Sequence, residues 1–250
     1  MSIIDLFFPR QVKCIFCSSE TKEFGICDKC YESLPFLTSP ICHNCGGKLI
    51  GKGKVCIECK GRHFDFDRSF AVLSYEGDVQ DKIISFKQNG NKYIGETFAW
   101  LIDRKFHELY LDIDIIIPVP ISEERTKERG FNQSEVLCVE LLSTGLVDTG
   151  VIKRVVDTPH QTGLSRENRE NNLKDCFKVI DKKKIKGKNV LLIDDIYTTG
   201  STLNECSKTL KKNGVNKVFA LCLARPPIRM NSVVEEINVD KKNSLAYNGE

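Results

Sequence analysis

Two adjacent carboxylates, Asp194 and Asp195, stand between the short apolar run Val190 to Ile193 and a loop rich in hydroxyl side chains. A buried strand that ends in such a pair presents both groups at the carboxyl edge of a sheet. There they can accept hydrogen bonds from vicinal sugar hydroxyls or hold a hydrated Mg²⁺. We therefore predict that Asp194 and Asp195 are the catalytic carboxylates of a site for a sugar ligand.

The loop after the carboxylates has the composition of a phosphate site. A helix is expected to begin where the loop ends, and a helix N-terminus offers unpaired N–H groups and partial positive charge to an anion. Gly200 lets the backbone approach a phosphate closely. An ordinary N-cap by serine or threonine is the alternative, but it would use one hydroxyl and neither carboxylate. The residues predicted to hold the phosphate are Thr198, Thr199, Gly200, Ser201 and Thr202.

A basic segment follows a second expected strand, Asp114 to Val119. The strand ends in Pro-Val-Pro, and the string Arg-Gly-Phe-Asn-Gln closes the segment at residues 129–133. Several cations beside exposed backbone suit a polyanion such as pyrophosphate. For each cation taken singly, a solvated helix face is an equal alternative. The residues assigned to this contact are Val119, Pro120, Arg125, Lys127 and Arg129.

A polar stretch punctuated by proline and glycine covers residues 158–173. Its composition is typical of a mobile lid that closes over a bound substrate and excludes water. An ordinary surface loop is the alternative for any one of its residues. The residues assigned to the lid are Gln161, Arg166 and Arg169.

Eight of the twelve cysteines lie before residue 60 and form four C-x-x-C pairs. Two such pairs can surround one tetrahedral Zn²⁺, so the pattern predicts two structural zinc ions. Sequential pairing is the simplest arrangement because the chain between pairs is short, and interleaved pairing stays open. Iron–sulfur ligation and redox-active pairs are the rival chemistries. The predicted ligands are Cys14, Cys17, Cys27 and Cys30 at one metal and Cys42, Cys45, Cys56 and Cys59 at the other.

Short apolar strands alternate with helices between these motifs, which predicts an α/β fold with a mostly parallel sheet covered on both faces. The other four cysteines stand singly in apolar surroundings and are expected to pack in the core. The expected strands are residues 69–75, 114–119, 151–156, 190–193 and 215–224, and the expected helices are 79–87, 93–106, 132–142 and 202–212.

The run Val190 to Thr202 resembles the signature with which type I phosphoribosyltransferases bind 5-phosphoribosyl-1-pyrophosphate (PRPP). With the basic segment, the lid and the four cysteine pairs, the chain resembles the ComF family over residues 10–227. The resemblance implies a double zinc ribbon over residues 10–62, a phosphoribosyltransferase-like domain over 64–227 and a poorly ordered tail over 228–250. It also implies binding of PRPP with magnesium, pentosyl transfer to an unknown acceptor, and a role in competence, the DNA uptake of natural transformation.

Three functions stay open on the sequence alone. The first is phosphoribosyl transfer, for which His107 and His160 are candidate bases by residue type only. The second is a non-catalytic PRPP sensor or single-stranded-DNA-binding adaptor, and the third is an inactive scaffold for a helicase-like competence partner. The zinc module could cover the active site, bind nucleic acid or dock a partner. Acceptor contacts are expected from a variable hood within residues 64–110.

Composition sets outer limits on these functions. The chain has 250 residues, of which 41% are hydrophobic, so it can bury one α/β core beside a small module. A formal net charge of +3 does not by itself indicate nucleic acid binding. No run is apolar enough to cross a bilayer. The apolar start at residues 1–9 lacks a basic n-region, so we expect a cytoplasmic protein, with peripheral attachment at the inner face of the membrane as an alternative.

Overall fold

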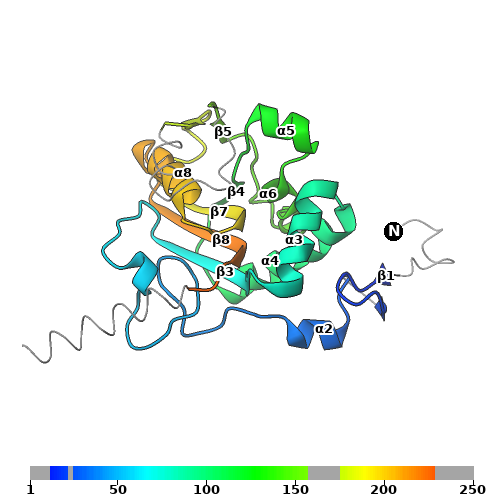
Figure 1. Cartoon of the computed structure of the whole chain (residues 1–250). Coiled ribbons are helices and arrows are strands. Elements are labelled where there is room, and N and C mark those ends of the chain that lie inside the picture. Colours follow the sequence, from blue (N-terminus) through cyan, green and yellow to red (C-terminus); the bar gives the residue numbers. More distant parts are fainter. Residues whose placement is uncertain (1–11, 22–24, 157–174, 229–250) are drawn as a thin grey trace, which may run out of the picture.

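Four strands form a parallel sheet at the centre of the computed structural model, which describes residues 12–21, 25–156 and 175–228 (Figure 1). In spatial order they are β3 (Arg68–Ser74), β8 (Lys217–Arg225), β7 (Asn189–Ile196) and β4 (Ile115–Pro118). Every pairing in this sheet is parallel, which confirms the predicted sheet type. Pro118, the last residue of β4, pairs with Ile193, so β7 extends beyond the end of β4 from Asp194 onward.

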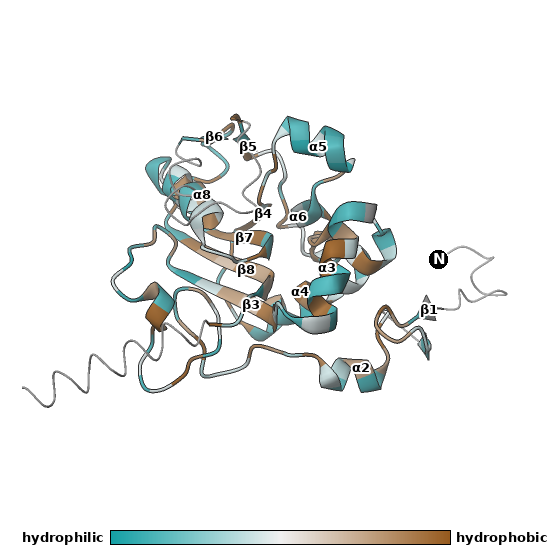
Figure 2. Cartoon of the chain, viewed as in Figure 1, coloured by the Kyte–Doolittle hydropathy of each residue, from teal (hydrophilic) through white to brown (hydrophobic). Residues whose placement is uncertain are grey.

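Helices cover both faces of this sheet because its central strands are apolar on both sides (Figure 2). In β7, Leu191 and Ile193 pack in a cluster with α3 (Gly77–Asn89) and α4 (Lys92–Glu108). The alternate residues of β7 pack in a second cluster with α8 (Ser201–Lys212). The predicted helices 79–87, 93–106 and 202–212 therefore correspond to α3, α4 and α8.

The prediction of one continuous helix over residues 132–142 is wrong. The structure has a four-residue helix α6 (Gln133–Val136) and then a 3₁₀ segment η2 (Glu140–Thr144), preceded by α5 (Glu123–Arg129). The cause is a switch of bonding pattern, because the N–H groups of Cys138 and Val139 bond to carbonyls three residues back, at 3.0 and 3.2 Å. Such i→i−3 bonds tighten the turn and break the α-helical repeat.

The strand expected over residues 151–156 forms outside the main sheet. It appears as β5 (Ile152–Arg154), which pairs antiparallel with β6 (Phe177–Val179), a strand that the sequence did not predict. The segment assigned to the lid, with Gln161, Arg166 and Arg169, lies between these two strands and outside the described residues. Residues 1–11 and the tail from residue 229 also lie outside the described residues.

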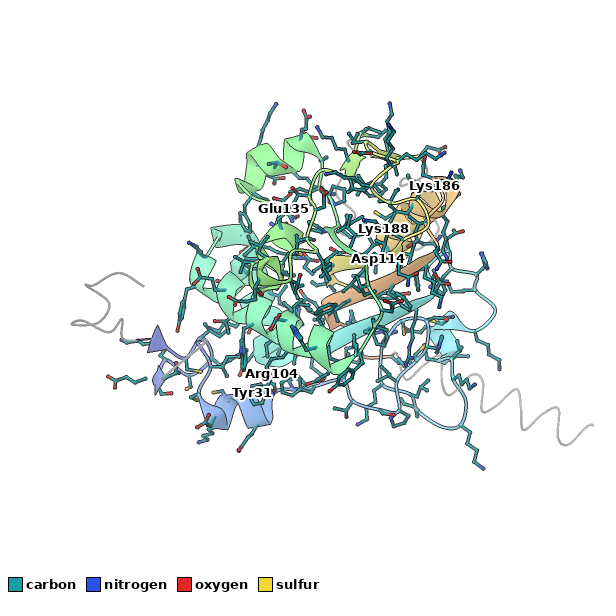
Figure 3. All side chains as sticks on the ribbon, turned by 180° about the vertical axis from the view of Figure 1, so that it is seen from behind. Tyr31, Arg104, Asp114, Glu135, Lys186 and Lys188 are labelled. Atoms are coloured by element: carbon teal, nitrogen blue, oxygen red, sulfur yellow. The ribbon has the colours of Figure 1, made fainter. Side chains whose placement is uncertain are left out.

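The two halves of the cysteine-rich segment pack on different parts of the domain. The first half contains β1 (Val12–Lys13), β2 (Glu20–Thr21) and α2 (Asp28–Ser33). It contacts α4, where the Arg104 guanidinium lies 5.4 Å from the Tyr31 ring centroid (Figure 3). The second half contains the 3₁₀ turn η1 (Ile57–Cys59) and packs directly on β3. A Cβ on Gly46 would lie 2.6 Å from the backbone nitrogen of Ala71, so only glycine fits this backbone contact.

The single cysteines and the apolarity of the helices were also predicted from the sequence. The four single cysteines are all buried, at 1% exposure or less, which confirms that they pack as core residues: Cys138, Cys176, Cys206 and Cys222. None of the helices in the described parts of the chain is long and apolar enough to span a membrane.

Candidate functional site

A cavity of about 350 Å³ opens at the carboxyl edge of the sheet. Residues that follow β3, β4 and β7 line it, as expected for ligand sites of open α/β sheets. The cavity brings together most of the residues that the sequence assigned to the site. Those that line it are Val119, Pro120, Arg125, Arg129, Asp194, Asp195, Thr198 and Thr202.

The two carboxylates stand at the end of β7, where the strand leaves the core. The first five residues of β7 are buried, whereas Asp194 and Asp195 are half-buried. One oxygen of Asp194 accepts hydrogen bonds from the Asp195 N–H at 2.9 Å and from the Ser134 hydroxyl at 3.3 Å. Burial, and then the neighbouring Asp195 charge, raise the pKa of Asp194 to about 7. Ionisation of both carboxylates is therefore unfavourable, and a bound cation would make it more favourable.

Lys87 supplies a cation at this point that the sequence analysis did not find. Its Nζ lies 2.8 Å from Asp195 Oδ2, and both side chains are largely buried, at 25% and 15% exposure. Lys87 belongs to the last turn of α3, and in the sequence it is an ordinary helix-ending lysine. Only the packing of α3 against the sheet reveals that it reaches the carboxylates.

Replacing Lys87 by methionine is expected to strengthen binding of Mg²⁺ alone about tenfold, because the ammonium group competes with the metal for Asp195. Calorimetric titration with magnesium chloride, without any phosphate ligand, measures this. Lys92→Met is the matched control, since Lys92 pairs with Glu96 on the exposed face of α4 and its loss should change nothing. Weaker Mg²⁺ binding by Lys87→Met would show that the lysine supports the metal rather than competing with it.

The loop between β7 and α8 is built on a glycine N-cap. Gly200 has a φ of 78°, which favours glycine, and it caps α8 without any side-chain cap bond. The alternative of an ordinary serine or threonine cap therefore does not describe this loop. The Thr199 and Ser201 hydroxyls lie 2.7 Å apart and bond to each other, while Thr198 and Thr202 line the cavity. Thr199, Gly200 and Ser201 are not among the lining residues, so the loop presents two hydroxyls to the cavity, those of Thr198 and Thr202.

The basic segment contributes unequally to the cavity. Arg125 and Arg129 of α5 line it, whereas Lys127 is exposed on the same helix and is not among the lining residues. The helical repeat explains this difference, because positions 125 and 129 share one face of α5 and position 127 does not. His107 lies outside the cavity on α4, beside Asp103, and His160 falls in the undescribed segment.

Gln133 and Arg154 are further polar residues of the cavity that the sequence analysis did not assign to it. Gln133 is 1% exposed, and its Nε2 has no hydrogen-bond partner in the described part of the chain, while its Oε1 accepts from Arg129 at 3.1 Å. Arg154 of β5 is 8% exposed and also lines the cavity. Gln133 ends the Arg-Gly-Phe-Asn-Gln string and could have been found from it. Arg154 had no such signal, because its strand was assigned to the main sheet.

The eight cysteines of the ribbons form two groups in which the sulfur atoms lie within 4.8 Å of one another. The groups follow the predicted sequential pairing, and we call them the first cluster (Cys14, Cys17, Cys27 and Cys30) and the second cluster (Cys42, Cys45, Cys56 and Cys59). Sulfur atoms around a tetrahedral Zn²⁺ at about 2.3 Å are separated by roughly 3.8 Å. The Cys17–Cys27 and Cys45–Cys56 sulfurs lie 3.6 and 3.7 Å apart, so both clusters fit structural zinc.

Exposure differs between the clusters and predicts an order of metal loss. The second cluster is buried throughout, whereas Cys17 of the first is exposed. Elemental analysis is expected to give two zinc ions per chain, and a chelator should remove one well before the other. Loss of the slower zinc should also lower the melting temperature of the sheet domain, because the second cluster shares its core. One zinc per chain, or iron with a visible absorption band, would contradict the double site.

Comparison with known proteins supports the same two-part architecture. Residues 3–60 match the double zinc ribbon domain family, and residues 128–243 match the phosphoribosyl transferase domain family. A hypoxanthine phosphoribosyltransferase structure from Staphylococcus aureus is 17% identical, with a TM-score of 0.33, and the match covers 59% of this chain and 65% of that one. The family matches confirm the predicted combination of a zinc ribbon with a phosphoribosyltransferase-type α/β fold.

Full-length relatives carry the assignment further. Competence protein F of Haemophilus influenzae is 32% identical over 224 residues, which cover 85% of this chain and 96% of that protein. DNA utilization protein YhgH of Salmonella typhimurium is 30% identical over 210 residues, which cover 81% of this chain and 91% of that protein. Because such a relative is matched over nearly its whole length, this chain belongs to the ComF family of competence proteins.

Proposed function

We propose that the cavity binds PRPP together with Mg²⁺, and that the protein acts in competence-related handling of DNA. The observation that carries the proposal is the joint arrangement of a carboxylate pair and a hydroxyl loop at one strand end. The carboxylates suit vicinal ribose hydroxyls, and the loop suits the 5-phosphate. The competence role is supported by the names of the relatives, a competence protein and a DNA utilization protein.

The donor set at the end of β7 fits magnesium. Mg²⁺ prefers carboxylate oxygens, keeps several waters and is commonly shared with substrate phosphates. Asp194 and Asp195 would hold the ion, directly or through water, once Lys87 yields the position that it takes beside Asp195. When bound, the ion would offset the charge of the pyrophosphate.

The basic side of the cavity fits the pyrophosphate group. Arg125 and Arg129 come from α5, and Arg154 approaches from β5. Gln133 adds a buried amide nitrogen, Nε2, that lacks a hydrogen-bond partner among the described residues. In a transfer reaction with an oxocarbenium-like sugar, such groups would stabilise negative charge on the leaving pyrophosphate. The lid residues Gln161, Arg166 and Arg169 and the exposed Lys127 stay predictions from the sequence.

The experiment that tests the proposal is calorimetric titration of the zinc-loaded chain with PRPP, with and without Mg²⁺. Saturable binding that strengthens with Mg²⁺ supports it, and absence of binding in both conditions contradicts it. Release of pyrophosphate from PRPP, measured across candidate acceptor molecules, then separates a transferase from a non-catalytic sensor. Binding of PRPP without release of pyrophosphate for any acceptor favours the non-catalytic sensor.

A further inference from the structure

The second cluster lies in the same apolar core as the predicted phosphate loop. Its four cysteines are each at most 5% exposed, and they belong to one cluster of buried residues with Tyr197 and Leu203. These two residues flank the loop, which spans residues 198–202. The first cluster is partly exposed and packs with the residues on the other face of the sheet. Of the two clusters, the second is therefore the one that packs with the residues flanking the loop.

Tyr197 lies in the core between the phosphate loop and the second cluster. It is 2% exposed, and its hydroxyl has no hydrogen-bond partner among the described residues. Tyr197 packs in the same cluster of buried residues as Cys45 and Cys59. A buried hydroxyl without a partner is unfavourable, and a zinc-bound thiolate is an acceptor that can satisfy it.

The same hydroxyl also supports Gly200. A Cβ placed on Gly200 would lie 2.3 Å from the Tyr197 hydroxyl oxygen and 2.6 Å from Cζ. The left-handed turn of the loop therefore rests directly on the end of the tyrosine ring. Phe66 packs edge-on against this ring, with 6.4 Å between centroids, so the ring is held from the ribbon side as well. A shift of Tyr197 would move the backbone of the loop at Gly200.

Arg62 makes a second connection. It follows Cys59 by three residues, and its N–H bonds to the Cys59 carbonyl at 3.1 Å. Its Nη2 donates to the Thr199 carbonyl at 3.1 Å, across 137 residues of sequence. Its guanidinium stacks on Phe64, 4.5 Å from the ring centroid. Tyr197 and, from the second ribbon, Arg62 thus contact the loop at adjacent points, Tyr197 at Gly200 and Arg62 at Thr199.

We propose that the second zinc cluster is the structural support of the phosphate loop, with Tyr197 and Arg62 as positioning residues. The loop geometry then depends on zinc at the second cluster and not on zinc at the first. Linkage is reciprocal, so a phosphate ligand at the loop also strengthens retention of the second zinc. The ligand part of this proposal rests on the proposed function of the loop, whereas the effect of the ribbon on loop geometry does not.

The first test is hydrogen–deuterium exchange of the zinc-loaded, ligand-free full chain. Arg62→Ala is expected to speed exchange of the amides of residues 197–204 about tenfold, the effect of losing one hydrogen bond from a charged donor. Arg104→Ala is the matched control, because Arg104 stacks on Tyr31 of the first ribbon. It should leave these amides unchanged. Equal exchange in all three proteins, or an equal increase in both variants, overturns the inference.

The second test follows zinc release to a chromogenic chelator. Tyr197→Phe keeps the ring and removes the hydroxyl, and it is expected to speed release of the slower zinc several-fold without changing the faster one. Ribose 5-phosphate should slow release of the slower zinc from the wild-type protein. If calorimetry shows that the wild type binds neither ribose 5-phosphate nor PRPP with Mg²⁺, the proposed function fails. The exchange and release measurements without ligand still decide the role of the cluster, and unchanged release by Tyr197→Phe counts against it.

Discussion

Replacing both Asp194 and Asp195 by asparagine is expected to weaken Mg²⁺-dependent PRPP binding at least about a hundredfold, which corresponds to about 2.7 kcal/mol. Asparagine keeps the size of the side chain but loses the charge that attracts the metal and accepts strongly from ribose hydroxyls. Calorimetric titration with PRPP and magnesium chloride measures the loss. Loss of the Asp194 charge relieves burial and repulsion, whereas loss of the Asp195 charge breaks its pair with Lys87, so the double variant should fold with a melting temperature close to that of the wild type.

The matched control for this experiment is Asp103→Asn, which removes a carboxylate that pairs with His107 on α4 and lies outside the cavity. Its PRPP affinity should equal that of the wild type. An unchanged affinity in the double variant would place the ligand elsewhere. A large drop in melting temperature would show instead that the carboxylates stabilise the fold, and the affinity loss could then not be assigned to the site.

The parallel sheet and the carboxylate–hydroxyl loop could be predicted because each is encoded by local sequence. Residues Val190 to Ile193 of β7 are apolar and buried, and a run buried on both faces has no polar positions to obscure it. The four C-x-x-C pairs likewise specify metal ligands by spacing alone. In these places, residue type, spacing and burial all indicate the same structure.

Other parts of the site depend on packing between distant segments and were missed. Lys87 meets Asp195 only because α3 crosses the carboxyl edge of the sheet, and nothing in the sequence around it differs from a solvated helix end. Arg62 reaches Thr199 across 137 residues. The antiparallel pairing of β5 with β6 was missed because an isolated apolar strand does not reveal which strand it will join.

The ribbon illustrates the same limit at the level of domains. The sequence presents residues 10–62 as a module held together by metal alone, and the composition supports this interpretation. In the structure, Arg225 at the end of β8 pairs with Glu58 in the turn of the second ribbon. The Ser69 hydroxyl of β3 donates to the Asn44 carbonyl at 2.6 Å. These contacts join the second ribbon to the sheet, so its metal contributes to the stability of both.

Gly200→Val is expected to abolish measurable ribose 5-phosphate binding, whereas Ser201→Ala should weaken it by roughly ten- to 150-fold. At Gly200 a branched side chain meets two obstacles, a φ of 78° and a contact of 2.3 Å with the Tyr197 hydroxyl. Ser201 loses one hydroxyl, already bonded to Thr199 at 2.7 Å, so the cost is at most about one hydrogen bond to a charged group, roughly 1.5–3 kcal/mol.

Gly187→Val provides the matched control for backbone strain. Gly187 has a φ of 76°, but a Cβ there would meet nothing within 4 Å. The Gly187→Val variant should therefore lose some thermal stability but retain ribose 5-phosphate affinity, because the strain at residue 187 does not reach the loop. Calorimetric affinities and melting temperatures of the three variants separate the two effects. If Ser201→Ala lost more affinity than Gly200→Val, the phosphate would bind through the serine hydroxyl. It would then not lie against the backbone turn at Gly200.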